Sequence, residues 1–143
     1  MDVKKRKILA LTLFSIYCIL LLWVILFKLM PPCEGVAYLR GIRSISWIPF
    51  DFDTNPHHHF LEVMLNFLIF VPFGLLLKQA FIKWWKIIIM AFFFSLFCEI
   101  TQYILMIGVT DVTDLITNTM GAVLGVLIFI AIRKLKLVNK KTR

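Results

Sequence analysis

The sequence predicts an all-α membrane protein with four transmembrane helices and both termini in the cytoplasm. Of its 143 residues, 61% are hydrophobic, well above the roughly half that is usual for soluble domains. These residues gather in four stretches, and a helix needs about 20 apolar residues to cross a bilayer. Basic residues flank the stretches. Four spans nearly exhaust the chain, so we expect one domain over residues 1–143 and no separate soluble catalytic domain.

The four predicted spans cover about residues 8–29, 60–77, 87–107 and 115–132. The first span follows a basic start, Lys4–Lys7, as a secretory signal does. It is longer than a signal's apolar region and no small-residue cleavage site follows it, so we expect it to remain as an anchor. Pro72 with Gly74 predicts a kink in the second span.

The basic residues predict the orientation of the chain. Four lie before the first span, three between the second and third, and six after the fourth, so thirteen of sixteen fall on one side. The positive-inside rule places that side, with both termini, in the cytoplasm of a multi-pass cell-membrane protein. The net charge of +8 is explained by this placement, and no basic and aromatic surface indicates nucleic acid as a partner.

The outer side then receives a loop over about residues 30–59 and a short loop around residues 108–114. Four prolines in the long loop disfavour a continuous helix there. Trp47, Ile48 and Phe50 are apolar enough to lie back on the membrane surface.

No metal or cofactor site is predicted. The three cysteines form no CxxC pair and no metal-ligand spacing. His57, His58 and His59 precede Glu62, which suggests a metal site if the second helix extends backward. Three adjacent histidines cannot share one helical face, however, and a histidine run in a loop also fits a solvated surface, so their role stays open.

Seven of the eight acidic residues lie on or below the outer surface, and this segregation is the main indication of function. Ionisable groups inside a membrane are costly unless paired or hydrated, and they generally face the protein interior or a cavity. Glu62 and Asn66 are four residues apart on the second span, and Glu99 and Gln102 are three apart on the third. Each pair therefore shares one helical face.

The fourth span carries a stripe of polar and small residues at intervals of three and four: Asp111, Asp114, Asn118, Gly121 and Gly125. Two glycines four residues apart let a neighbouring helix approach closely. We therefore expect the deeper half of this stripe to pack against another span.

A structural interpretation stands beside the functional one for most of these residues. Asp111 and Asp114 lie where a helix begins, and a carboxylate there caps free N–H groups and complements the helix dipole. Asn118 and Gln102 fit hydrogen bonds between helices, which is a common structural role in membranes. Glu62 lies near the interface, where a solvated carboxylate costs little.

Glu99 differs, because it lies about 12 Å of helix below the outer end of its span and needs a partner or a changed protonation state. We expect a functional role for it. Arg43 is the candidate partner, although the guanidinium group binds lipid phosphate equally well.

Four motifs in order resemble the VanZ-like family of bacterial membrane proteins. They are Arg43 to Phe50 with its Pro49, Asn66-x-x-x-Phe70-x-Pro72-x-Gly74, Glu99-x-x-Gln102, and Asp111-x-x-Asp114-x-x-x-Asn118-x-x-Gly121-x-x-x-Gly125. The resemblance spans about two thirds of the chain and implies a small polytopic envelope protein. The family is named for a member associated with teicoplanin resistance. Many members carry an Arg shortly before the paired aspartates, whereas this chain has Gly108-Val109-Thr110.

The leading functional hypothesis is an outer-leaflet polar pocket that binds a lipid headgroup or a lipid-anchored envelope molecule and contributes to teicoplanin resistance. Its expected ligand-binding residues are Arg43, Glu62, Asn66, Glu99, Gln102, Asp111, Asp114 and Asn118. Two alternatives stay open: an enzyme acting on an envelope lipid or wall precursor with Glu99 as general acid or base, and a small oligomeric transporter. The sequence indicates no nucleophile, no ligand identity and no oligomeric state.

Overall fold

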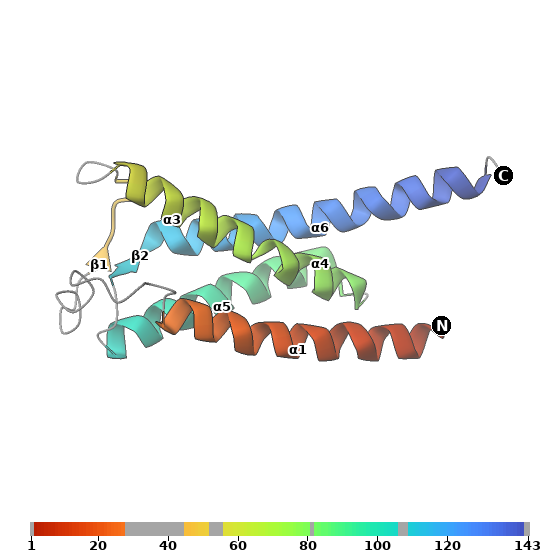
Figure 1. Ribbon diagram of the computed structural model, residues 1–143, viewed down its shortest axis with the longest axis horizontal. Helices are drawn as coiled ribbons and strands as arrows, with labels where there is room; N and C mark the ends of the chain where they lie inside the picture. The colour runs from red at the N-terminus through yellow and green to blue at the C-terminus, as the bar shows by residue number, and fades with distance from the viewer. Residues whose placement is uncertain (1, 28–44, 52–55, 81, 106–108, 142–143) are drawn as a thin grey trace.

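The structure is a computed structural model, and it describes residues 2–27, 45–51, 56–80, 82–105 and 109–141 (Figure 1). The elements, in chain order, are α1 (Val3–Phe27), β1 (Ile45–Ser46), α3 (Pro56–Ile69), α4 (Val71–Gln79), α5 (Trp84–Leu105), β2 (Thr110–Asp111) and α6 (Val112–Lys141). Apart from the two short strands, the secondary structure of the described residues is helical, which confirms the all-α prediction.

The first and last helices run so that the two ends of the chain lie at the same end of the molecule (Figure 1). We call this end the terminal end and the opposite end, which carries β1 and β2, the strand end. Within the described residues, four helical segments are long and apolar enough to cross a membrane: Val3–Ile25, His59–Gln79, Trp84–Leu105 and Val112–Leu137. The protein is therefore a multi-pass membrane protein with the predicted number of spans.

The helices extend beyond the predicted apolar stretches. α1 includes the basic residues before residue 8, and α6 continues well past residue 132, because Lys and Arg are good helix formers and need no apolar surroundings. α3 begins at Pro56, four residues before the predicted start of the second span. Proline is favoured in the first turn of a helix, where its missing N–H is not needed.

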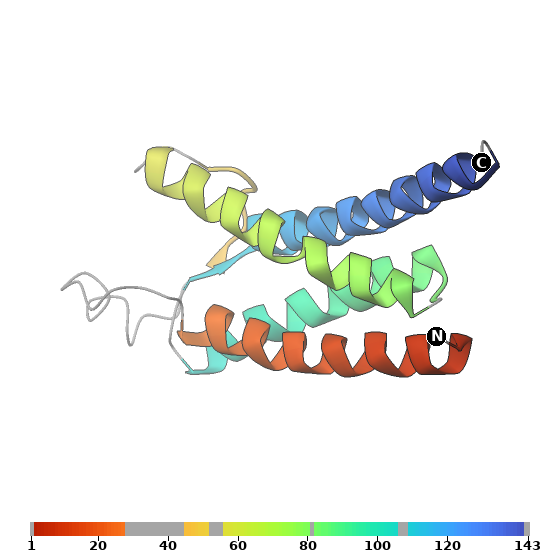
Figure 2. The ribbon, with the colours of Figure 1, turned by 45° about the vertical axis from the view of Figure 1, so that its right-hand side comes forward.

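The second span is interrupted at Phe70, between α3 and α4, and Figure 2 shows the change of direction. Pro72 follows two residues later and can donate no backbone hydrogen bond, which frees a carbonyl in the preceding turn. Close by, the Tyr17 hydroxyl of α1 donates a hydrogen bond to the Ile69 carbonyl. The predicted kink is confirmed, and a neighbouring helix supplies a partner to the backbone at the break.

α6 packs against α3 and α4 through its glycines. A Cβ on Gly121 would clash with the Phe67 carbonyl oxygen, and a Cβ on Gly125 would lie 2.8 Å from the Leu75 amide nitrogen. Gly74 of α4 faces α6 in the same way. The deeper half of the α6 stripe therefore packs against another span, as predicted, and the backbones meet too closely for any side chain at these positions.

The buried core lies along this same contact, where Phe70 and Phe73 are fully buried and stack with ring centroids 5.6 Å apart. Phe14 of α1 meets Phe73 edge-on at 4.9 Å, and Phe94 of α5 completes the cluster. Large apolar side chains on the outside of α1, α3, α5 and α6 are exposed. An apolar outer surface of this extent suits lipid and not water.

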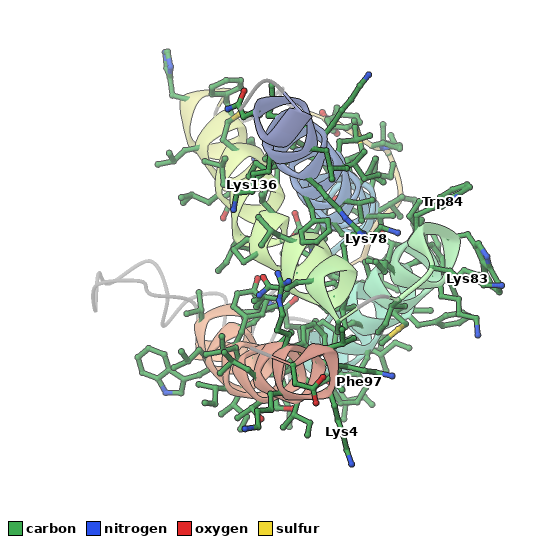
Figure 3. The ribbon with its side chains drawn as sticks, turned by 90° about the vertical axis from the view of Figure 1, so that its right-hand side faces the viewer. Lys4, Lys78, Lys83, Trp84, Phe97 and Lys136 are labelled. Atoms are coloured by element: carbon green, nitrogen blue, oxygen red, sulfur yellow. The ribbon has the colours of Figure 1, made fainter. Side chains whose placement is uncertain are left out.

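Basic side chains surround the terminal end. Figure 3 looks at this end and labels Lys4, Lys78, Lys83 and Lys136, which come from α1, α4, the turn before α5, and α6. Every Lys and Arg within the described residues lies in these segments or at the start of α5. The predicted gathering of the cations on one side is thus a property of the folded chain as well.

Candidate functional site

Two strands that are distant in sequence meet at the strand end. β1 and β2 pair in parallel, with Ile45 opposite Thr110 and Ser46 opposite Asp111. Just beyond this pair, the Phe50 backbone N–H donates a hydrogen bond to the Thr113 hydroxyl over 3.0 Å. The segment from Ile45 to Phe50 is therefore attached by its backbone to the residues that begin α6.

Asp111 caps α6. Its Oδ1 accepts a hydrogen bond of 2.7 Å from the backbone N–H of Thr113, the second residue of the helix, which is the usual N-cap arrangement. Asp114 lies in the first turn of α6, where a carboxylate complements the helix dipole. The capping interpretation is confirmed for Asp111.

Glu99 is buried, with 4% of its surface exposed. It lies six residues before the end of α5 at Leu105. Its Oε2 accepts the backbone N–H of Asp111 at 3.0 Å, and its backbone carbonyl accepts the Thr110 hydroxyl at 3.1 Å. The carboxyl group that the sequence marked as needing a partner thus holds β2 and the start of α6 against α5.

Gln102 connects α5 to α1. Its Nε2 donates to the Ile25 carbonyl at 3.1 Å. Ile25 lies in the last turn of α1, where helix carbonyls have no partner within the helix. The side chain is 2% exposed, and its Oε1 is buried without a hydrogen-bond partner among the described residues. The Gln102 side chain therefore joins two helices by one hydrogen bond and leaves its own acceptor oxygen unused.

Asn118 connects α6 to α5 in a similar way. Its Nδ2 donates to the Ser95 hydroxyl at 2.8 Å, and both side chains are buried. Within the described part of the chain, Asn118 Oδ1 has no hydrogen-bond donor. Asn118 therefore faces α5, whereas Gly121 and Gly125 on the same stripe face α3 and α4. The interhelical role expected for Gln102 and Asn118 is confirmed.

The polar residues of α3 form a separate group. Because α3 begins at Pro56, His59 and Glu62 lie one turn apart, and His59 Nδ1 is 3.7 Å from Glu62 Oε2. Asn66 lies one turn further along α3 and is half-buried. No three His, Cys, Asp or Glu side chains of the described chain lie close enough together to hold a metal ion.

The predicted site residues thus make several separate contacts. Glu99 and Asp111 meet directly, Gln102 and Asn118 make separate contacts between helices, and Glu62 has a contact within α3. Arg43 lies outside the described residues.

Sequence reasoning missed Ser95, Thr113 and Tyr17, which complete these hydrogen bonds. The only local signal was the Asp-x-Thr spacing at the start of α6, which is typical of a capped helix. Ser95 and Tyr17 act across pairs of helices, and no sequence period marks such a partner.

Known proteins identify the family. The VanZ/LLP1 family model matches residues 14–133. Protein VanZ of Enterococcus faecium is 40% identical to this chain over 125 residues, which cover 86% of this chain and 74% of that protein. No solved structure matches the chain significantly. The matched region contains the His59–Gln79 and Trp84–Leu105 segments and parts of the first and last membrane-crossing segments, and it shows that this chain belongs to the VanZ-like family of membrane proteins.

Proposed function

We propose that this chain is a bacterial cell-envelope protein whose strand end faces outward and binds the polar headgroup of a lipid or of a lipid-anchored envelope molecule. We propose further that this binding reduces susceptibility to teicoplanin. Both termini then lie in the cytoplasm. The proposed binding residues are Arg43, Glu62, Asn66, Glu99, Gln102, Asp111, Asp114 and Asn118.

The charge distribution supports this orientation. The Lys and Arg residues of the described chain gather at the terminal end. All described acidic residues except Asp2 lie in the strand half of the bundle. Bacterial membrane proteins keep an excess of Lys and Arg on the cytoplasmic side, so the terminal end faces the cytoplasm in the proposal.

The observation that carries the binding proposal is that three acceptor side chains on the neighbouring helices α5 and α6 are buried. The Glu99 carboxyl group is buried in the last third of α5, and Gln102 Oε1 and Asn118 Oδ1 are buried without a donor among the described residues. A buried acceptor that stays unpaired costs about 1–3 kcal/mol. A bound group that donates hydrogen bonds, such as a hydroxyl or ammonium headgroup, would remove that cost.

Family membership supports the physiological part of the proposal. The chain shares 40% identity with protein VanZ over most of its length, and the family is named for a member associated with resistance to teicoplanin. Teicoplanin carries an acyl chain, and its targets are membrane-anchored wall precursors. A headgroup site in the outer leaflet is therefore well located to change the access of this drug.

The test is teicoplanin susceptibility in a susceptible Gram-positive host. Strains would express the wild type, Glu99→Gln, Gln102→Leu or Asn118→Leu at matched membrane levels. We expect the wild type to lower susceptibility and each variant to lose that effect. Thr12→Ala, on an exposed face of α1, is the matched control and retains it.

Two results would contradict the proposal. If the wild-type protein leaves teicoplanin susceptibility unchanged, the resistance function is wrong. If native mass spectrometry finds the same co-purified lipids on the wild type and on Glu99→Gln, the headgroup site is wrong. A glycopeptide without an acyl chain is the drug control, because its susceptibility should change less.

A further inference from the structure

The segment Trp47–Phe50, which we call the aromatic turn, has its backbone attached to the bundle and its side chains turned outward. Trp47 is 72% exposed, Ile48 66% and Phe50 43%. The backbone beside it is held by the β1–β2 pair and by the hydrogen bond from Phe50 to Thr113, which is itself buried. The fold therefore presents three large apolar side chains at a fixed place instead of burying them.

The backbone conformation of the turn adds a second observation. Phe50 has φ of 59°, a left-handed conformation that bulky side chains rarely adopt and that glycine adopts readily. Proline followed by a residue of positive φ is the pattern of a type II turn, whose second central position favours glycine. A phenylalanine at this position points to a role for its ring, because glycine would form the same turn with less strain.

The depth of the turn in the membrane follows from α5. This helix runs from Trp84 to Leu105, and its 22 residues span about 33 Å, close to the hydrocarbon thickness of a bilayer. Trp84 and Trp85 are exposed at its first end and mark one membrane interface. β2 lies beside the last two turns of α5, where Thr110 and Asp111 bond to Glu99, and the aromatic turn is attached to β2 through β1. The turn therefore lies near the second interface.

Lipid is the occupant that fits these side chains. Tryptophan combines a large apolar surface with a preference for the boundary between headgroups and acyl chains, and phenylalanine adds a further large apolar surface. In water, the exposed apolar surface of Trp47 and Ile48 would carry a free-energy cost of hydration that contact with acyl chains removes. The helices that flank the turn already expose apolar side chains that suit lipid, so the apolar surface continues from them onto the turn.

We propose that the aromatic turn is an anchor in the leaflet at the strand end and that lipid contact on this turn braces the Glu99 site. The connection is short. Lipid holds Trp47 and Phe50, the Phe50 amide holds Thr113, and the β1–β2 pair holds Asp111, whose amide is bonded to Glu99. Loss of the lipid contact loosens the start of α6 where it meets α5. This inference needs no ligand and stands independently of the proposed function.

The first experiment measures the position of Trp47. Proteins with a single tryptophan, Trp47 or Trp85, are made by replacing the other three with Phe and are reconstituted in phosphatidylglycerol and phosphatidylethanolamine vesicles. We expect brominated acyl chains to quench both tryptophans to a similar extent and aqueous acrylamide to quench neither strongly. Strong acrylamide quenching of Trp47 without quenching by brominated lipid overturns the proposal. Protection from both quenchers that disappears on dilution of the protein also overturns it, because a second copy then covers the turn.

The second experiment measures the brace. Amide hydrogen exchange is followed over residues 109–115 in vesicles of the same composition. We expect faster exchange in Trp47→Ala and unchanged exchange in Trp47→Phe, which keeps an aromatic ring. Phe50→Gly and Phe50→Ala both remove a ring, and glycine keeps the turn. If both Phe50 variants exchange faster, the ring matters as proposed. If Phe50→Gly exchanges like the wild type, or if Trp47→Ala does, the lipid brace is wrong.

Discussion

Replacing Glu99 with alanine removes the oxygen that accepts the Asp111 amide at 3.0 Å. Glu99 is 4% exposed, so water does not readily take the place of the carboxyl group. A buried donor left without a partner costs about 1–3 kcal/mol. We therefore expect the contact between β2 and α5 to weaken by about 2 kcal/mol, which is roughly thirtyfold in the ratio of its closed to its open form.

Glu99→Gln separates this structural role from any role of the carboxyl group in binding. Glutamine keeps an oxygen of the same reach, so we expect it to accept the Asp111 amide at a cost below about 1 kcal/mol. Thr110→Val is the matched control, because it removes only the hydroxyl bond to the Glu99 carbonyl. Its expected cost is about 1 kcal/mol with the carboxyl group intact.

Hydrogen exchange of residues 109–115, monitored by mass spectrometry, checks these values. The order of exchange rates should be Glu99→Ala fastest, then Thr110→Val, with Glu99→Gln close to the wild type. Equal exchange in Glu99→Ala and the wild type would refute the reasoning, because the Asp111 amide would then depend on another group. If Glu99→Gln loses the protection against teicoplanin but keeps the hydrogen-exchange rates of the wild type, the carboxyl group of Glu99 has a role in function in addition to its structural role.

Three further predictions concern helix contacts and are read as free energies of unfolding in SDS-containing mixed micelles. Gly125→Ala places a methyl group against the α4 backbone, so we expect a loss of about 2 kcal/mol in the free energy of unfolding, within the range of overpacked sites. The control Ala131→Val, on an exposed face, should leave the stability unchanged. An unaffected Gly125→Ala variant would contradict the close packing. Tyr17→Phe removes the hydroxyl donor to Ile69 and should cost about 1 kcal/mol; no loss would mean that the backbone at the break is satisfied in another way. Gln102→Leu loses one hydrogen bond but also removes a buried unpaired oxygen, so we expect the free energy of unfolding to stay nearly the same or to rise. A loss of stability above about 2 kcal/mol would show that this oxygen has a partner in the folded protein.

Much of the fold could be predicted because the membrane restricts it. Apolar length marked the spans, Pro72 with Gly74 marked the break at Phe70, and the glycine spacing on α6 marked the close contact with α3 and α4. These features are local, and their physical causes act within one helix. The helix ends were less predictable, because a helix continues into basic residues after the apolar stretch stops.

The candidate site was predicted as a set of residues and not as an arrangement. Spacing placed Glu99 and Gln102 on one face of α5, and both are buried. It gave no indication that Gln102 reaches α1 or that Asn118 bonds to Ser95. One partner of the Glu99 carboxyl group is a backbone amide, which sequence reasoning cannot identify because every residue other than proline carries one.

The sequence by itself determined the class of the protein, the number of membrane crossings and the separation of basic from acidic residues. Each of these follows from the free-energy cost of placing apolar groups in water or charged groups in the membrane. The tertiary structure decided which polar groups meet. It bonded Asp111 to Glu99, paired Ser46 with Asp111, and turned Trp47 outward at the strand end. Those choices depend on the packing of several helices at once, since a hydrogen bond forms only where two separate backbones bring its donor and acceptor within about 3 Å.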